Sequence, residues 1–163
     1  MIFTGCTLIG LRLSARLTQR QRALQKFIEI LVNLKGQMCG LGIPLVAAFE
    51  NIGKENTGGV WSDIFMQCSS IMKERNINAG EAWKKALENN KNIYLDECDY
   101  EQLWDFGERL GKSDRLNQEK VLELEKEKLT IMEKKAREVA ETRGKLYRSL
   151  GALTGAAVVI LLI

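Results

Sequence analysis

The chain has 163 residues, of which 28% are charged and 45% hydrophobic, and its formal net charge is only +3. This length suffices for one domain with its own core, and the small net charge gives little support to a polycation that binds nucleic acid. The sequence contains no histidine and no glycine-rich phosphate loop, so hydrolases, zinc enzymes and nucleotide-binding proteins are disfavoured, and we expect no catalytic residues, no cofactor, no metal site and no small-molecule substrate.

The hydrophobic spacing indicates an all-α protein. The chain has one proline, few runs of β-branched residues, and repeated steps of three and four between apolar positions. We therefore expect a bundle of about six helices. The four cysteines lie about thirty residues apart without a Cys-x-x-Cys pair, which predicts small buried residues in a reducing compartment rather than a zinc or disulfide framework.

The first segment, residues 1–17, is apolar up to Leu11 and then carries Arg12 and Arg16. A secretory signal peptide has its positive charge before the apolar stretch, and here the order is reversed. We interpret the segment as a truncated or short N-terminal membrane anchor, and a start codon upstream of the one used here would explain a truncation. The alternative is the amphipathic start of a soluble helix.

Five helical segments are expected between the N-terminal segment and residue 111. In order, they cover residues 24–38, 44–53, 60–74, 79–87 and 100–110. The first has one apolar stripe, formed by Leu24, Phe27, Leu31, Leu34 and Met38. Gly53 and Gly111 are predicted helix stops, and Asn78 with Glu81 is a predicted capping box.

The last helix is predicted to be the longest. Ser113 is its expected N-cap, and from Asp114 onward neither glycine nor proline occurs before Gly144. Its apolar residues follow a seven-residue pattern through Leu122, Leu129, Met132, Ala136, Val139 and Leu146. Polar residues interrupt the pattern at Arg115, Gln118, Glu125 and Arg143, which favours packing within a bundle over a free two-stranded coiled coil. If the helix continues to residue 163, it is about 75 Å long.

Residues 149–163 carry no charge and follow Arg143, Lys145 and Arg148. As a helix they span about 22 Å, which is short of a ~30 Å hydrocarbon core unless Tyr147 is included and Arg148 extends its head group to the surface. We interpret them as a C-terminal transmembrane segment, with a buried helix of a soluble domain as the alternative. Gly151 and Gly155 form a weak Gly-x-x-x-Gly signal for helix packing in a membrane.

The predicted membrane boundaries are both basic. They consist of Arg12, Arg16, Arg143, Lys145, Tyr147 and Arg148. The positive-inside rule then places residues 18–148, the predicted helical-bundle domain, on the cytoplasmic side. The stripe of Arg12, Arg16 and Arg20 fits either a solvated helix face or a contact with phosphate headgroups. The acidic residues from Asp96 to Glu108 favour a solvated face and loop, with a docking patch for a basic partner as the alternative.

Three motifs together resemble a known family. They are Gly40-Leu-Gly-Ile-Pro-Leu45, Phe106-Gly-Glu-Arg-Leu-Gly-Lys-Ser-Asp-Arg115 followed by Gln118, and Gly144-Lys-Leu-Tyr-Arg-Ser-Leu-Gly151 leading to Ile160-Leu-Leu-Ile163. In order and spacing they resemble stage III sporulation protein AB of endospore-forming bacteria over nearly the whole chain. The family usually has a fuller N-terminal hydrophobic helix than the eleven residues that precede Arg12 here.

The resemblance implies a small bitopic protein of the mother-cell membrane. Its cytoplasmic helical domain is expected to be similar to the platform-protein domain of type II secretion and type IV pilus systems. The resemblance also implies a place in the channel complex that links mother cell and forespore, beside a cytoplasmic secretion-type ATPase, and it supplies no catalytic residues. We therefore expect a non-enzymatic, membrane-anchored adaptor that docks this ATPase and other membrane proteins of the channel.

Within this interpretation the candidate interaction residues are Gly107, Gly111, Asp114 and Arg115, because they form the corner at which the last helix begins. A rival hypothesis is a tail-anchored coiled-coil scaffold without a secretion role. A second rival is a nucleic-acid binder that uses the basic stretch from Arg12 to Lys26. A third is a soluble protein whose apolar tail folds back into its own core.

Overall fold

The computed structural model describes residues 2–56, 59–75, 77–91, 94–111 and 115–162, and every regular element within them is helical. The elements are α1 (Ile2–Lys35), the short π-helix η1 (Gly36–Gly40), α2 (Leu45–Glu55), α3 (Val60–Arg75), α4 (Ala79–Asn89), α5 (Glu97–Arg109) and α6 (Arg115–Leu162). The prediction of an all-α fold with six α-helices is thus confirmed for this part of the chain.

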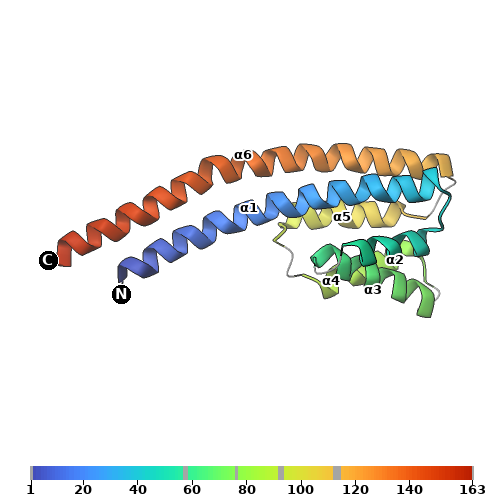
Figure 1. Cartoon of the computed structure of the whole chain (residues 1–163), viewed down its shortest axis with the longest axis horizontal. Coiled ribbons are helices and arrows are strands. Elements are labelled where there is room, and N and C mark those ends of the chain that lie inside the picture. The colour runs from blue at the N-terminus through green and yellow to red at the C-terminus, as the bar shows by residue number, and fades with distance from the viewer. Residues whose placement is uncertain (1, 57–58, 76, 92–93, 112–114, 163) are drawn as a thin grey trace.

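A long antiparallel hairpin dominates the molecule (Figure 1). Its two arms are α1, with 34 residues, and α6, with 48 residues or about 72 Å. The shorter helices α2 to α5 cluster at the far end of the hairpin, and both chain termini lie together at the other end. The expected continuous last helix is present from Arg115 to Leu162, whereas its predicted N-cap, Ser113, lies outside the described residues.

The core of the bundle is an aromatic cluster to which α1 to α5 each contribute. Its members are Phe27, Phe49, Trp61, Phe65, Trp83 and Phe106. Phe27 stacks on Trp61 with ring centroids 4.4 Å apart, and Phe49 meets Phe65 edge to face at 5.0 Å. Such pairs add about 0.5–1.5 kcal/mol each beyond the area that they bury. Because Phe27 belongs to α1, this cluster fixes the bundle to the hairpin.

Several predicted helix features are confirmed. Leu24, Phe27, Leu31 and Leu34 form the buried stripe of α1, whereas Met38, the last member of the predicted stripe, lies in η1 and is half-buried. The Glu81 backbone N–H donates to the Asn78 side chain at 2.9 Å, so Asn78 caps α4 as predicted. The reciprocal bond of the predicted capping box, from the Asn78 N–H to the Glu81 side chain, does not occur among the described residues. Capping by an Asn side chain satisfies one of the N–H groups that a helix start leaves without an intrahelical partner.

Two predicted helix boundaries are wrong. Gly53 does not end α2, which continues to Glu55; it is buried, and a Cβ there would lie 2.4 Å from Met66 Cγ. Gly53 is therefore a point of close approach between α2 and α3 rather than a stop. Helix α5 begins at Glu97 instead of residue 100, because Asp96 and Asp99 form a capping box before it.

The buried stripe of α6 departs from the predicted heptad toward the C-terminus. The heptad continues from Leu129 and Ala136 to Arg143 and Leu146, whereas the structure buries Gly144 and leaves the latter two exposed. An α-helix repeats every 3.6 residues, so a strict heptad drifts by about 20° per repeat around it. The seam with α1 has accordingly rotated by one position at Gly144.

The cysteines do not share one environment. Cys68 is buried, and burial raises the pKa of its thiol to about 12, but Cys98 is exposed and Cys39 is half-buried. The expectation of uniformly buried cysteines is therefore wrong at Cys98. Along the described residues, no helix combines the length and the apolar character required to cross a membrane.

Candidate interaction surfaces

Gly107 of the predicted corner lies where α5 crosses α4. A Cβ at Gly107 would approach Trp83 Cδ1 to 2.2 Å, and a Cβ at Gly80 would lie 2.9 Å from the Gly107 carbonyl oxygen. The two glycines therefore allow the backbones to touch. The Trp83 indole N–H donates to the Leu103 carbonyl at 2.8 Å, which holds the ring in this crossing.

Gly111 ends α5 and passes the chain toward α6. Its φ of 70° lies in the left-handed region that favours glycine. Gln118, buried on the first turns of α6, accepts from the Gly111 N–H at 3.2 Å and donates to the Arg109 carbonyl at 3.3 Å. Gln118 thereby satisfies the end of α5, which explains its place after the second motif.

Gly107 and Gly111 both lie at this corner in the structure, whereas the other two predicted residues are described only in part or not at all. Asp114 lies outside the described residues. Arg115 is the first residue of α6, and only its backbone is described. The described corner consists of packing contacts and helix-capping hydrogen bonds.

A buried ion pair, which the sequence did not reveal, joins α1 to the start of α5. Arg20 donates to both carboxylate oxygens of Asp99, at 2.7 and 2.9 Å, and contacts Asp96 at 2.8 Å. Asp99 is fully buried and also accepts from the Asp96 backbone N–H at 3.0 Å. The hydrogen bonds to Asp99 raise the pKa of Arg20 above its ordinary value.

This ion pair corrects two expectations. Arg20 does not belong to a solvated or lipid-facing stripe with Arg12 and Arg16, because it is turned to the bundle. The acidic stretch from Asp96 to Glu108 is not wholly a solvated face, because Asp99 is buried. A bidentate arginine bonded to a carboxylate that also accepts a backbone N–H is the geometry in which a buried charge is tolerated.

Glu125 is a second buried carboxyl group, on the face of α6 that meets α5. Gln102 donates to its Oε2 at 2.7 Å, whereas its Oε1 has no hydrogen-bond partner among the described residues. Burial raises the pKa of Glu125 to about 7, despite the opposing effects of the Gln102 hydrogen bond and of nearby Lys128 and Arg109. Glu125, one of the polar residues that interrupt the predicted heptad of α6, therefore changes its charge near neutral pH.

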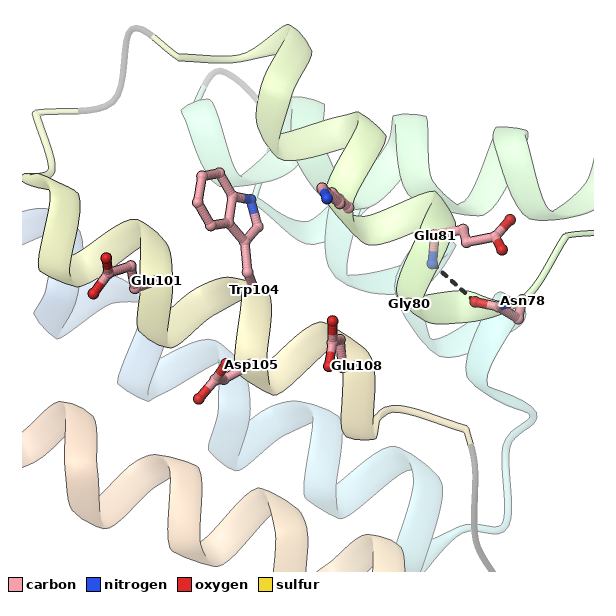
Figure 2. A pocket seen from close by; sticks show the side chains of 8 residues that line it. Asn78, Gly80, Glu81, Glu101, Trp104, Asp105 and Glu108 are labelled. Carbon is pink, nitrogen blue, oxygen red and sulfur yellow. Dashed lines mark hydrogen bonds between the residues drawn. The ribbon is translucent and has the colours of Figure 1, made fainter.

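An acidic groove lies between α4 and α5, with a volume of about 540 Å³ (Figure 2). It is lined by Asn78, Gly80, Glu81, Lys84, Glu101, Trp104, Asp105 and Glu108. Trp104 projects from α5 into this space, and its indole N–H finds no hydrogen-bond partner among the described residues. Within the same part of the chain, Glu81, Glu101 and Glu108 form no ion pair, and Asp105 approaches Arg109 only to 3.9 Å.

The predicted membrane-boundary residues gather on the side of the hairpin that bears the termini, at the level where its two arms leave the bundle, and we call this level the hairpin base. Arg12, Arg16, Arg143 and Lys145 are exposed there, and Tyr147 is half-buried. Exposed apolar side chains surround them: Ile9, Leu11, Leu13, Leu146, Leu150 and Leu153. Gly151 and Gly155 lie on α6 beyond this point, and the surroundings of these two glycines and of the Arg148 side chain are outside the description.

A smaller groove of about 280 Å³ opens at the hairpin base. Its lining includes Leu13 and Arg16 of α1, Tyr94 of the connection between α4 and α5, and Tyr147 of α6. Nothing in the sequence pattern places Tyr94 near Tyr147, because 53 positions separate them and Tyr94 lies in a connection without periodicity.

Comparison with known proteins points to one family. The family model for stage III sporulation protein AB matches residues 1–163. Stage III sporulation protein AB of Bacillus subtilis strain 168 is 28% identical over 162 residues, which cover 99% of this chain and 94% of that protein. A solved structure of stage III sporulation protein AB superposes with a TM-score of 0.68 at 27% identity, over 76% of this chain and 97% of the other.

The motifs that suggested this relationship occupy defined places in the fold. The second motif contains the close crossing at Gly107 and the left-handed turn at Gly111, and Gln118 caps the C-terminal end of α5 there. The third motif begins at the buried Gly144 of α6, and its Lys145 and Tyr147 lie at the hairpin base. With the match over its whole length, the chain belongs to the stage III sporulation protein AB family.

Proposed function

We propose that this protein is a non-enzymatic, membrane-anchored adaptor of a sporulation channel complex linking mother cell and forespore, and that its bundle docks a cytoplasmic secretion-type ATPase. Membership of the stage III sporulation protein AB family supports a role in sporulation. The observation that supports the adaptor role is the shape of the hairpin, which has the bundle at one end and both termini at the other (Figure 1). Such a shape separates an anchoring end from a docking end.

The anchor comprises the two predicted membrane segments, residues 1–17 and 149–163. Their support is the concentration of exposed apolar side chains at the hairpin base, next to four exposed basic residues. Large apolar patches with a polar rim mark surfaces that water does not cover in the working protein. Because both segments leave the same end of the hairpin, they enter one membrane from one side, with residues 18–148 in the cytoplasm.

The docking surface for the ATPase is the groove between α4 and α5. Its support is the combination of half-buried Trp104 with the carboxylates of Glu81, Glu101 and Glu108, which form no ion pair with any other described residue (Figure 2). Aromatic side chains at the centre of a patch contribute strongly to binding energy, and uncompensated charges at its rim select a partner of opposite charge. The groove therefore suits a basic surface on the partner.

The test is binding of the full chain, in detergent micelles, to the secretion-type ATPase of the same host. Reversing two groove charges with Glu101→Lys and Glu108→Lys should weaken binding about ten-fold or more. The matched control, Glu138→Lys with Glu141→Lys, makes the same change of charge on exposed positions of α6 and should leave the affinity unchanged. Equal affinities for both double variants, or no binding by the unmodified chain, would remove the groove from the proposal.

A further inference from the structure

Four exposed basic side chains at the hairpin base have no acidic partner among the described residues. They are Arg12 and Arg16 on α1 and Arg143 and Lys145 on α6. Arg20, the next arginine along α1, is by contrast paired with two aspartates. Four positive charges without an ion pair within a short length of the hairpin create a positive potential there, which favours an anionic surface as partner.

The groove at the hairpin base adds aromatic side chains to these charges. Arg16 lines it together with Leu13, Tyr94 and Tyr147. Tyr94 lies in the connection between α4 and α5 and lines this groove, yet 47% of its surface remains exposed. Tyrosine has an apolar ring and a polar hydroxyl, and it is enriched where one end of a side chain is apolar and the other is hydrated.

The position of Tyr94 along the hairpin is equally informative. Through this groove the connection between α4 and α5 reaches α1 at the level of Leu13, and beyond that level α1 and α6 continue without the bundle (Figure 1). The protruding arms measure about 16 Å from Leu13 to Ile2 and about 22 Å from Tyr147 to Leu162. Along the hairpin, the order is therefore two arms of apolar sequence, then the tyrosines and basic residues, then the bundle.

We propose that the hairpin base binds an anionic phospholipid surface. The side chains of Arg12, Arg16, Arg143 and Lys145 contact lipid phosphates, and Tyr94 rests at the level of the headgroups. The bundle is thereby held against the membrane through the connection between α4 and α5 instead of swinging freely on its two arms. This inference rests on the proposed insertion of the helix ends, and it adds the lipid class and the orientation of the bundle.

The lipid class can be tested by flotation of the full chain with vesicles. The vesicles contain phosphatidylcholine alone or the same lipid with about 30% phosphatidylglycerol, since each basic residue near an anionic surface contributes about a five-fold increase in partitioning. The full chain should bind the anionic vesicles far more strongly. Arg12→Gln with Arg16→Gln should lower partitioning onto them about thirty-fold and leave binding to the neutral vesicles unchanged.

A matched control is available on the same helix. Arg22→Gln with Lys26→Gln removes the same charge from exposed positions about 15 Å further from the base, beyond the screening length at physiological salt. Lys26 also forms an exposed ion pair with Glu29 at 3.4 Å, which contributes little to stability. This variant should bind like the unmodified chain. If both double variants lose binding equally, net charge rather than the hairpin base governs the interaction, and the proposal is wrong.

The orientation is tested with Tyr94→Trp and a lipid that carries a nitroxide quencher near its headgroup. Trp61 and Trp83 are buried and Trp104 lies in the groove between α4 and α5, so only the new indole should be quenched in anionic vesicles. If the variant floats with the anionic vesicles but the fluorescence of the tryptophan at position 94 is not quenched, the bundle is not docked on the membrane.

The flotation result also separates this inference from the proposed anchor. Equal binding to neutral and anionic vesicles would keep the anchor and overturn the lipid preference. Binding to neither would overturn both.

Discussion

At the residue scale, the contact between Arg20 and Asp99 links the hairpin to the bundle. Both carboxylate oxygens of the buried Asp99 accept from Arg20, and the same carboxylate caps α5 through the Asp96 backbone. Removing one partner of such a pair leaves the other charge without compensation. The position of α5 against α1 therefore depends on this pair as well as on the aromatic core.

Asp99→Asn should lower the free energy of unfolding by about 3 kcal/mol, because it removes the buried bidentate carboxylate and leaves the partly buried Arg20 with only the exposed Asp96, 2.8 Å away. Asp105→Asn, at an exposed position whose nearest nitrogen on Arg109 is 3.9 Å away, should change it by less than about 0.5 kcal/mol. Denaturant unfolding of the full chain, followed by circular dichroism, compares the two. Similar small losses for both would mean that the buried pair is energetically neutral.

Gly107→Ala should lower the free energy of unfolding by about 2–4 kcal/mol, because the added Cβ collides with Trp83 and forces α4 and α5 apart. Gly36→Ala is the control, since a Cβ at Gly36 meets no atom within 4 Å; it should be neutral or stabilise by up to about 1 kcal/mol. Thermal unfolding of the two variants gives the comparison. Unchanged stability of Gly107→Ala would contradict the close helix crossing.

Glu125 should make stability depend on pH. Its pKa rises from 4.5 to about 7 on folding, so the native state binds more protons than the unfolded state between these values. The contribution of Glu125 to stability should therefore be fully present below about pH 4.5. It should be lost as the pH rises through 7, which lowers the free energy of unfolding by about 3 kcal/mol. In Glu125→Gln this fall should disappear, whereas the exposed control Glu141→Gln should retain it. Unfolding curves at several pH values from 5 to 8 measure the difference.

Sequence reasoning at this scale succeeded where the signal was local and failed where the partner was distant. Asn78 and Gly111 were identified from their neighbours, since capping depends on residues within a turn. Asp99 was missed because its partner, Arg20, is 79 positions away. Gly53 was misassigned because its contact with Met66 belongs to another helix, so a glycine needed for packing resembled a glycine that ends a helix.

At the element scale, the apolar stripe of α6 packs against α1 of the same chain. Leu122, Leu129 and Ala136 are buried against α1. The rival hypothesis of a coiled-coil scaffold needs this same stripe for a second chain, so the intramolecular hairpin competes with it directly. The periodicity predicted the stripe correctly, but it could not tell whether the facing helix is α1 or another copy.

Leu129→Ala should destabilise the protein by about 2–5 kcal/mol, because Leu129 is fully buried in this seam. Ile131→Ala should cost less than about 0.5 kcal/mol, since Ile131 is 56% exposed on the other side of α6. Sedimentation of both variants and of the unmodified chain in detergent should show the same oligomeric state. A dimer that dissociates in Leu129→Ala would support the scaffold instead.

At the scale of the whole molecule, the fold separates an apolar, basic end from an acidic groove. The apolar arms and basic residues lie at the hairpin base, and the groove around Trp104 lies on the bundle. The sequence predicted the order of these features along the chain, including the basic residues at both margins. It could not predict that the connection at Tyr94 reaches the hairpin base, because this depends on how the bundle packs on α1.

The measurement that bears most directly on a membrane-anchored adaptor is fractionation of sporulating cells that produce either the full chain or a version ending at Arg148. The full chain should sediment with membranes and remain there after a high-salt wash, whereas the shortened version, which lacks the uncharged residues 149–163, should be released by salt to a much greater extent. Equal recovery of both forms in the soluble fraction would contradict anchoring through the C-terminal segment.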